Sequence, residues 1–176
     1  MSGHNKWSKI KHKKAATDAA KSKVFGKFSR LIAVESKKCG GDVNSPGLRS
    51  VIEQAKAVSM PGSNIEKAIK KGAGGDTGNM EEVMYEAYGP GGCAIIITGL
   101  TDNKNRTSAE LRHILSKVGA ELAAQGSASW AFTKEGNEWI PNSTVPLSDA
   151  DGEKLTNIIE ALEENDDVQN VYTNAE

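Results

Sequence analysis

The sequence changes both its hydrophobic spacing and the sign of its charge across one glycine-rich stretch, Gly72 to Asn79. Residues 1–72 hold 16 Lys and Arg against 5 Asp and Glu, a net charge of +11. Residues 73–176 hold 6 against 18, a net charge of −12, so the formal charge of the whole chain, −1, hides the separation. We therefore predict a basic domain over residues 1–72, a Gly-rich linker over 73–79 and an acidic domain over 80–176.

The basic half has helical periodicity. Apolar residues recur three and four positions apart in three segments that are bounded by Gly or Pro. The predicted helices run from about Thr17 or Asp18 to Lys38, from Ser45-Pro46 to before Pro61, and from Ser63 to Gly72. Ser63 and Glu66 have the spacing of a capping box for the third helix. Because so small a bundle buries only about 60% of its unfolded surface, we expect residues 1–14 to form a flexible arm in the absence of a partner.

The acidic half alternates between strand and helix signals. Runs of β-branched and alternating apolar residues predict strands over Glu82–Tyr88, Cys93–Thr98, Ala128–Thr133, Trp139–Val145 and Val168–Thr173. Amphipathic helices are predicted after two capping boxes, Thr107 with Glu110 and Ser148 with Asp151. Strands interleaved with helices indicate an α+β fold, so we expect a basic three-helix domain followed by an α+β sandwich.

Positive charge is densest near the N-terminus, where residues 1–38 carry ten Lys and Arg30 against only Asp18 and Glu35. A merely soluble surface mixes the two signs, so a field of one sign predicts contact with nucleic acid. Trp7 and His12 lie within this run, where an aromatic ring could stack on an exposed base or pack against the bundle. The candidate nucleic-acid-binding residues are Lys6, Trp7, Lys9, Lys11, His12, Lys13, Lys14, Lys21, Lys23, Lys27 and Arg30.

Lys predominates over Arg among these residues. Lys contacts phosphate as a point charge, whereas Arg is better suited to reading guanine edges, so we expect backbone binding rather than a sharp base code. If about six of these residues neutralise phosphates, the log–log salt slope should be near −5 on duplex DNA. A second candidate anion site is Lys104 with Arg106, beside a predicted helix N-terminus, although an ordinary strand-to-helix loop is the simpler interpretation.

The sequence favours no catalytic residues, no metal and no cofactor. It contains no Walker A motif, and Gly72–Gly75 follows a helix instead of a strand, which argues against a dinucleotide fingerprint. His113 falls off the apolar stripe of its predicted helix and Cys93 begins a buried strand, so we do not expect a Cys-His dyad. A nuclease would need a carboxylate cluster for metal ions, which the basic half does not supply.

Cysteine usage and hydropathy bear on location. Cys39 and Cys93 belong to no C-x-x-C pair, so neither a disulfide framework nor a zinc site is predicted, and two such thiols are typical of a reducing cytoplasm. The longest aliphatic run, Ala94 to Ile97, is far shorter than the ~20 residues that cross a bilayer. We therefore expect a cytoplasmic protein with nucleic-acid and protein partners, and neither a membrane contact nor a small-molecule substrate.

Several ordered motifs, spread from Gly3 to Tyr172, resemble the YebC/PmpR family. They include Gly3-His4-Asn5-Lys6-Trp7-Ser8, Tyr85-Glu86-Ala87-Tyr88-Gly89-Pro90-Gly91-Gly92, Asp102-Asn103-Lys104-Asn105-Arg106-Thr107 and Asp166-Asp167-Val168-Gln169-Asn170-Val171-Tyr172. The resemblance implies an N-terminal three-helix domain followed by two α+β domains. It also implies a place among proteins described as probable transcriptional regulators, a family that includes mitochondrial translational activators.

The sequence departs from the family pattern at one point. In the family a third α+β subdomain is inserted within the second domain, but here Phe132–Gly136 runs almost directly into Trp139–Pro141, so the insertion is missing. Charge and resemblance together predict a non-enzymatic DNA-binding transcriptional regulator. The alternative is a ribosome-associated translation factor that binds ribosomal RNA through the same basic face. In either case we expect the acidic domain to orient the protein on nucleic acid or to contact a ribosomal or transcription protein.

Overall fold

The computed structural model describes residues 18–176. These residues divide between two compact units, 18–81 and 82–176, which are described separately. The candidate residues Lys6, Trp7, Lys9, Lys11, His12, Lys13 and Lys14, and the predicted arm, lie outside the described residues. The mixture of helices with an antiparallel sheet confirms the α+β class. No helix within residues 18–176 is both long and apolar enough to cross a membrane.

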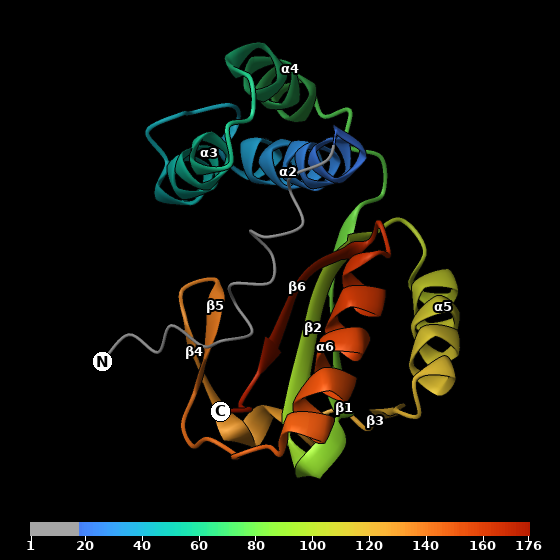
Figure 1. The fold of residues 1–176 in the computed structure, drawn as a ribbon. Coiled ribbons are helices and arrows are strands. Elements are labelled where there is room, and N and C mark those ends of the chain that lie inside the picture. The colour runs from blue at the N-terminus through green and yellow to red at the C-terminus, as the bar shows by residue number, and fades with distance from the viewer. Residues whose placement is uncertain (1–17) are drawn as a thin grey trace. The chain divides into compact units, whose positions relative to one another are not determined.

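The described part of the first unit, the helical unit, contains α2 (Asp18–Cys39), α3 (Pro46–Ala57) and α4 (Gly62–Ala73), as Figure 1 shows. These helices confirm the three segments that periodicity predicted. Their apolar stripes meet in one core, whose buried residues are Ile32, Leu48, Val51, Ala55, Met60, Ile65 and Ala68.

Two details of the third helix differ from the prediction. α4 begins at Gly62, and its N-cap is Pro61, so Ser63 lies inside the first turn and does not act as the predicted cap. The helix also packs very closely on α2, since a Cβ atom added at Gly72 would lie 2.2 Å from the carbonyl oxygen of Ala33. Ser36 strengthens this contact by donating its hydroxyl to the Ile69 carbonyl at 2.7 Å. Gly72 is therefore required by packing, and the helix ends one residue beyond it, at Ala73.

The second unit, the α+β unit, is built on a sheet with strand order β3-β1-β2-β6. β1 (Glu81–Tyr88) pairs antiparallel with β3 (Glu121–Ala123), and β2 (Ala94–Thr101) pairs antiparallel with β6 (Val168–Thr173). β2 lies inside the sheet and is buried on both faces, which explains its uninterrupted aliphatic run.

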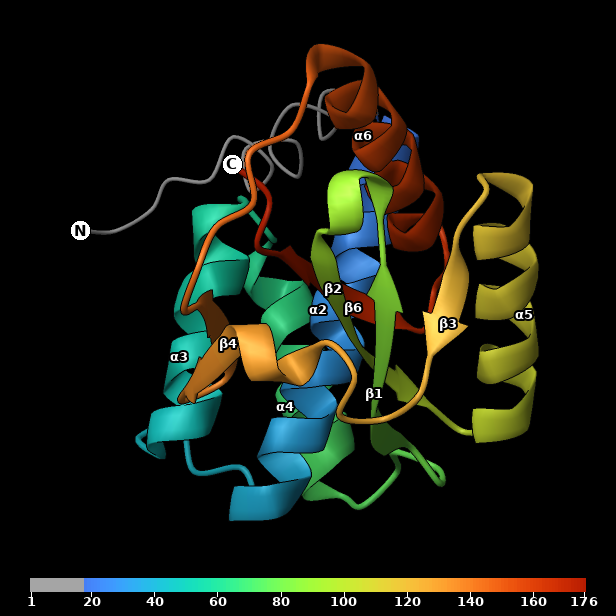
Figure 2. The same cartoon turned by 90° about the horizontal axis from the view of Figure 1, so that it is seen from below.

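Different elements cover the two faces of this sheet (Figures 1 and 2). Helices α5 (Lys104–Lys117) and α6 (Asp149–Glu163) pack against one face through a core that includes Ile95, Ile97 and Leu155. The opposite face, with Ala94 and Ile96, is covered by the short 3-10 turn η2 (Ser129–Ala131) and the hairpin of β4 (Phe132–Glu135) and β5 (Glu138–Pro141). The sheet is thus enclosed between two helices and a small β-hairpin.

The hairpin differs from the predicted strands. The segment predicted as a strand over Ala128–Thr133 begins as η2, and β4 starts only at Phe132. The strand predicted over Trp139–Val145 ends at Pro141, and Val145 forms an isolated bridge with Ala175 instead. The short β3 was not predicted, because three residues carry too little alternation to be recognised.

The β4–β5 turn is the point where the family resemblance places an inserted subdomain. Glu135 pairs with Glu138, so only Gly136 and Asn137 lie between the strands. Gly136 has a φ of +60°, which a two-residue hairpin turn needs at this position. The two strands therefore connect directly.

Candidate nucleic-acid interface and polar networks

Helix α2 carries the four described residues of the predicted interface. Lys21 is exposed, and Lys23, Lys27 and Arg30 are partly exposed. The last three are spaced four and three positions apart, which places them on one side of the helix. That side lies opposite the buried Ile32, because the core residues occupy the intervening helical positions. Lys21 falls off this stripe, near the start of the helix.

Further lysines belong to the same unit but were missed as candidates. Lys37 continues the α2 stripe, since it follows Arg30 by two full turns. Lys37 and Lys38 stand in the last turn of α2, and Lys70 and Lys71 in the last turn of α4. The contacts of Gly72 with α2 bring these two helix ends together. The sequence signal for these residues was a Lys pair before Gly at each helix end. The same pattern is typical of ordinary helix C-termini, where cations interact favourably with the helix dipole, so it does not by itself indicate nucleic-acid binding.

The second candidate anion site lies at the junction of β2 and α5. Asn103 is the N-cap of α5 and accepts a hydrogen bond from the Arg106 backbone N–H at 3.0 Å. The predicted cap, Thr107, instead lies inside the helix and is 1% exposed. Its hydroxyl lies 2.9 Å from the Oδ2 atom of Asp167. Thr107 was mistaken for a cap because its polar partner is 60 residues away in sequence.

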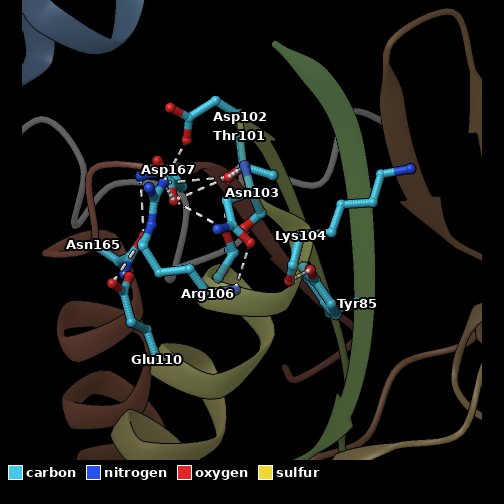
Figure 3. A network of polar contacts seen from close by, with 10 residues as sticks. Tyr85, Thr101, Asp102, Asn103, Lys104, Arg106, Glu110, Asn165 and Asp167 are labelled. Carbon is cyan, nitrogen blue, oxygen red and sulfur yellow. Dashed lines mark hydrogen bonds and ion pairs between the residues drawn. The ribbon is translucent and has the colours of Figure 1, made fainter. Parts of the chain in front are cut away.

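Asp167 is the centre of this network, which Figure 3 shows. The residue is 5% exposed, and its Oδ2 atom accepts from Arg106 Nη2 at 2.9 Å and lies 3.3 Å from Thr101 Oγ1. The Asp167 carbonyl accepts from the Leu100 backbone N–H at 2.8 Å. The network therefore ties the end of β2, the start of α5 and the loop before β6 to one another.

Arg106 is surrounded by carboxylates. Its Nη2 atom lies 2.9 Å from both Asp167 Oδ2 and Asp102 Oδ1, and its Nε atom lies 3.8 Å from Glu110 Oε1. The hydrogen bonds to Asp167 and Asp102 raise the Arg106 pKa. Figure 3 shows the Lys104 side chain directed away from this network. Anion binding by Lys104 and Arg106 stays a prediction, and the carboxylates around Arg106 weigh against it.

A second network holds the loop before η2. Glu86 on β1 is 2% exposed. Its carboxylate accepts the backbone N–H groups of Gly126 at 2.8 Å, Ala128 at 2.6 Å and Ser129 at 2.9 Å. Burial by itself would raise the Glu86 pKa, but these N–H groups outweigh burial and lower it. The sequence offered no sign of this role, because the accepted N–H groups belong to residues 40 to 43 positions away.

The two side chains considered for a Cys-His dyad, Cys93 and His113, differ in exposure. Cys93 is fully buried, and burial raises the pKa of its thiol, which disfavours the thiolate. His113 is exposed on α5. Both cysteines are free. Within residues 18–176 no group of three or more His, Cys, Asp or Glu side chains is arranged to hold a metal ion.

Comparison with known proteins gives matches along nearly the whole chain. Residues 5–75 match the TACO1/YebC protein N-terminal domain, and residues 80–137 and 135–175 match the TACO1/YebC second and third domain. A probable transcriptional regulatory protein of Thermosipho africanus is 40% identical, with 100% of this chain and 94% of the relative covered. One from Petrotoga mobilis, with the same description, is 48% identical over 98% of this chain and 70% of its own length.

One solved structure is also similar to this chain in both fold and sequence. The crystal structure of a conserved hypothetical protein from Aquifex aeolicus has a TM-score of 0.84 and 34% identity, and the match covers 98% of this chain and 97% of that one. The alignment with the Thermosipho protein extends over 237 residues, 61 more than the 176 of this chain. The two matched pieces of the second and third domain meet at the β4–β5 hairpin. These matches show that the chain belongs to the TACO1/YebC family.

Proposed function

We propose that this protein is a non-enzymatic regulatory protein that binds nucleic acid through the basic surface of its helical unit. The observation that carries the proposal is the stripe of Lys23, Lys27, Arg30 and Lys37 on the side of α2 opposite the core. Its relatives are named probable transcriptional regulatory proteins, and duplex DNA is the target that we propose first.

The charge of the helical unit supports contact with phosphate groups. Residues 18–72 hold 11 Lys and Arg against 5 Asp and Glu, so the surplus does not depend on the residues before Asp18. Each phosphate that a cation neutralises releases condensed counterions, which makes the affinity fall steeply with salt. Nine of the 11 cations are Lys, which favours backbone contact over base readout.

The same preference for backbone contact supports a second candidate, a translation factor that binds ribosomal RNA. Lys residues that contact phosphates do not distinguish a promoter from a structured RNA. In both candidates the acidic α+β unit would orient the protein on the nucleic acid, or would contact a basic protein of the same assembly. A cytoplasmic location, predicted from the sequence, suits either role.

The binding surface can be tested by salt titration. The variant K23Q/K27Q removes two charges from the stripe, and R49Q/K56Q removes two from α3 as a matched control. For wild type we expect a steep negative log–log slope on duplex DNA, and for K23Q/K27Q a slope flatter by about 2, at ~0.9 per phosphate contact. The control should stay close to wild type. A wild-type affinity that does not depend on salt would refute the proposal.

A sedimentation experiment separates the two targets. Lysate is run through a sucrose gradient with and without nuclease treatment, and the protein is followed across the fractions. Co-migration with ribosomal particles, lost on charge reversal of Lys11, Lys13 and Lys14, would favour the translation factor over a role at promoters alone. Strong discrimination between promoter and random duplex at physiological salt would favour the transcriptional regulator.

A further inference from the structure

An exposed aromatic pair stands on the hairpin side of the α+β unit. Trp130, in η2, is 65% exposed, and Tyr88, at the end of β1, is 38% exposed. The Trp130 indole N–H donates to the Tyr88 hydroxyl at 3.1 Å, and that hydroxyl donates to the Ser127 carbonyl. The polar edge of the indole is therefore satisfied inside the protein, while most of its apolar ring surface is left in water.

The protein holds this pair rigidly. Glu86, two residues before Tyr88 on β1, binds three backbone N–H groups of the segment that leads into Trp130. On the other side, the Asn142 side-chain amide donates to the Trp130 carbonyl at 3.3 Å. Burying a carboxylate costs free energy unless it is fully hydrogen-bonded, and here the bonds order the loop that presents the exposed ring. Such an arrangement pre-organises a surface for contact.

The surroundings of the ring are polar but mostly neutral. Ser127 and Asn142 touch the aromatic pair, and Thr133 bonds to Asn142 at 2.5 Å. One acid, Glu121, is exposed and lies opposite Tyr88 on β3. The acidic helix α6 covers the other face of the sheet. A phosphate group would find no cation among the residues named here, whereas a neutral aromatic ring would find an exposed π-face.

We propose that Trp130, with Tyr88 beside it, is a stacking platform for an unpaired nucleobase. The inference rests on the proposed function and concerns those of its targets, such as ribosomal RNA, that expose unpaired bases. Stacking on an aromatic ring tolerates any base and adds to affinity without electrostatic steering. Each unit then has its own kind of contact: phosphates bind to the lysines of α2, and an exposed base stacks on Trp130.

The experiment compares a labelled single-stranded oligouridylate with a labelled duplex of equal length, by fluorescence anisotropy. Raised salt is used so that the lysine contribution is reduced. Trp130→Ala is expected to weaken single-strand binding by about tenfold, and Trp130→Phe to retain most of the affinity. Neither change should alter duplex binding, because paired bases are not available for stacking. Ile140→Ala, which shortens an exposed apolar side chain on the neighbouring β4–β5 hairpin, is the control and should bind as wild type does.

The outcomes separate this inference from the proposed function. Single-strand affinity unchanged in Trp130→Ala, alongside a weakened K23Q/K27Q, would overturn the platform and leave the basic surface standing. Absence of binding to either probe by the wild type would overturn both. Sedimentation equilibrium supplies one further check. Self-association that Trp130→Ala abolishes would assign the aromatic pair to a second copy of the chain, and would also overturn base stacking.

Discussion

Replacing Glu86 by Gln tests how the loop before η2 is held. The Glu86 Oε1 atom accepts the Gly126 N–H, and Oε2 accepts the N–H groups of Ala128 and Ser129. Gln keeps the shape of the side chain but has one oxygen and an NH₂ group. In either orientation of the amide, at least one backbone N–H would face another donor.

The magnitude follows from these contacts. A buried donor left without an acceptor costs roughly 1–3 kcal/mol, and each remaining bond loses about 1 kcal/mol when its acceptor is no longer charged. Relief of the desolvation of a buried carboxylate offsets part of this loss. We expect Glu86→Gln to lower the free energy of unfolding of the α+β unit by about 2 kcal/mol.

The effect should also depend on pH. The folded-state pKa of Glu86 is lowered from its ordinary value of 4.5. A carboxyl with a lowered folded pKa stabilises the folded state above its unfolded pKa, and that contribution is lost as the pH falls through the folded pKa. The stability difference between wild type and Glu86→Gln should therefore be complete at neutral pH and shrink as the pH drops below 4.5.

Urea denaturation followed by tryptophan fluorescence measures this difference, since Trp130 and Trp139 lie in the α+β unit. Glu121→Gln, an exposed carboxylate on β3, is the matched control and should change stability by less than about 0.5 kcal/mol. If Glu86→Gln unfolds at the same urea concentration as the control, the three N–H contacts do not hold the loop in the way the distances indicate.

Three further predictions concern other contacts. Gly72→Ala should destabilise the helical unit by at least about 2 kcal/mol in urea denaturation, because the added Cβ would lie 2.2 Å from the Ala33 carbonyl oxygen; an unchanged midpoint would contradict the close crossing. Asp167→Ala should lower the free energy of unfolding by about 2 kcal/mol, because it removes the acceptor of buried hydroxyl groups. Arg106→Gln should lower it by less, because the guanidinium is exposed, and a larger loss for Arg106→Gln than for Asp167→Ala would contradict the central role of Asp167. Burial raises the pKa of Tyr172 to about 12. The neutral Tyr172 phenol should therefore stabilise the folded state below pH 10, and this contribution should be lost between pH 10 and about 12. Absorbance titration of wild type and Tyr172→Phe tests the prediction, which fails if the variant has one tyrosine fewer than wild type ionising near pH 10.

Local patterns in the sequence were sufficient for the helices of the first unit. Apolar residues at helical spacing, with Gly or Pro at the ends, specify α2, α3 and α4 because each helix must turn one stripe toward a core. The cap of α6 was predictable for the same local reason: Ser148 accepts from the Asp151 N–H three residues on. The charge separation is likewise a property of the sequence and needs no coordinates.

Tertiary structure alone decided the roles of residues whose partners are distant in the chain. Thr107 has the spacing of a cap, yet its hydroxyl meets Asp167 in the interior. Glu86 looks like any strand carboxylate, but it binds the loop that presents Trp130. Spacing records which residues share a face of one element, but it carries no information about which element packs against that face. Lys23, Lys27 and Arg30 could therefore be named as candidates from the sequence, although Lys37 was missed, whereas the buried networks and the exposed aromatic pair could not be predicted.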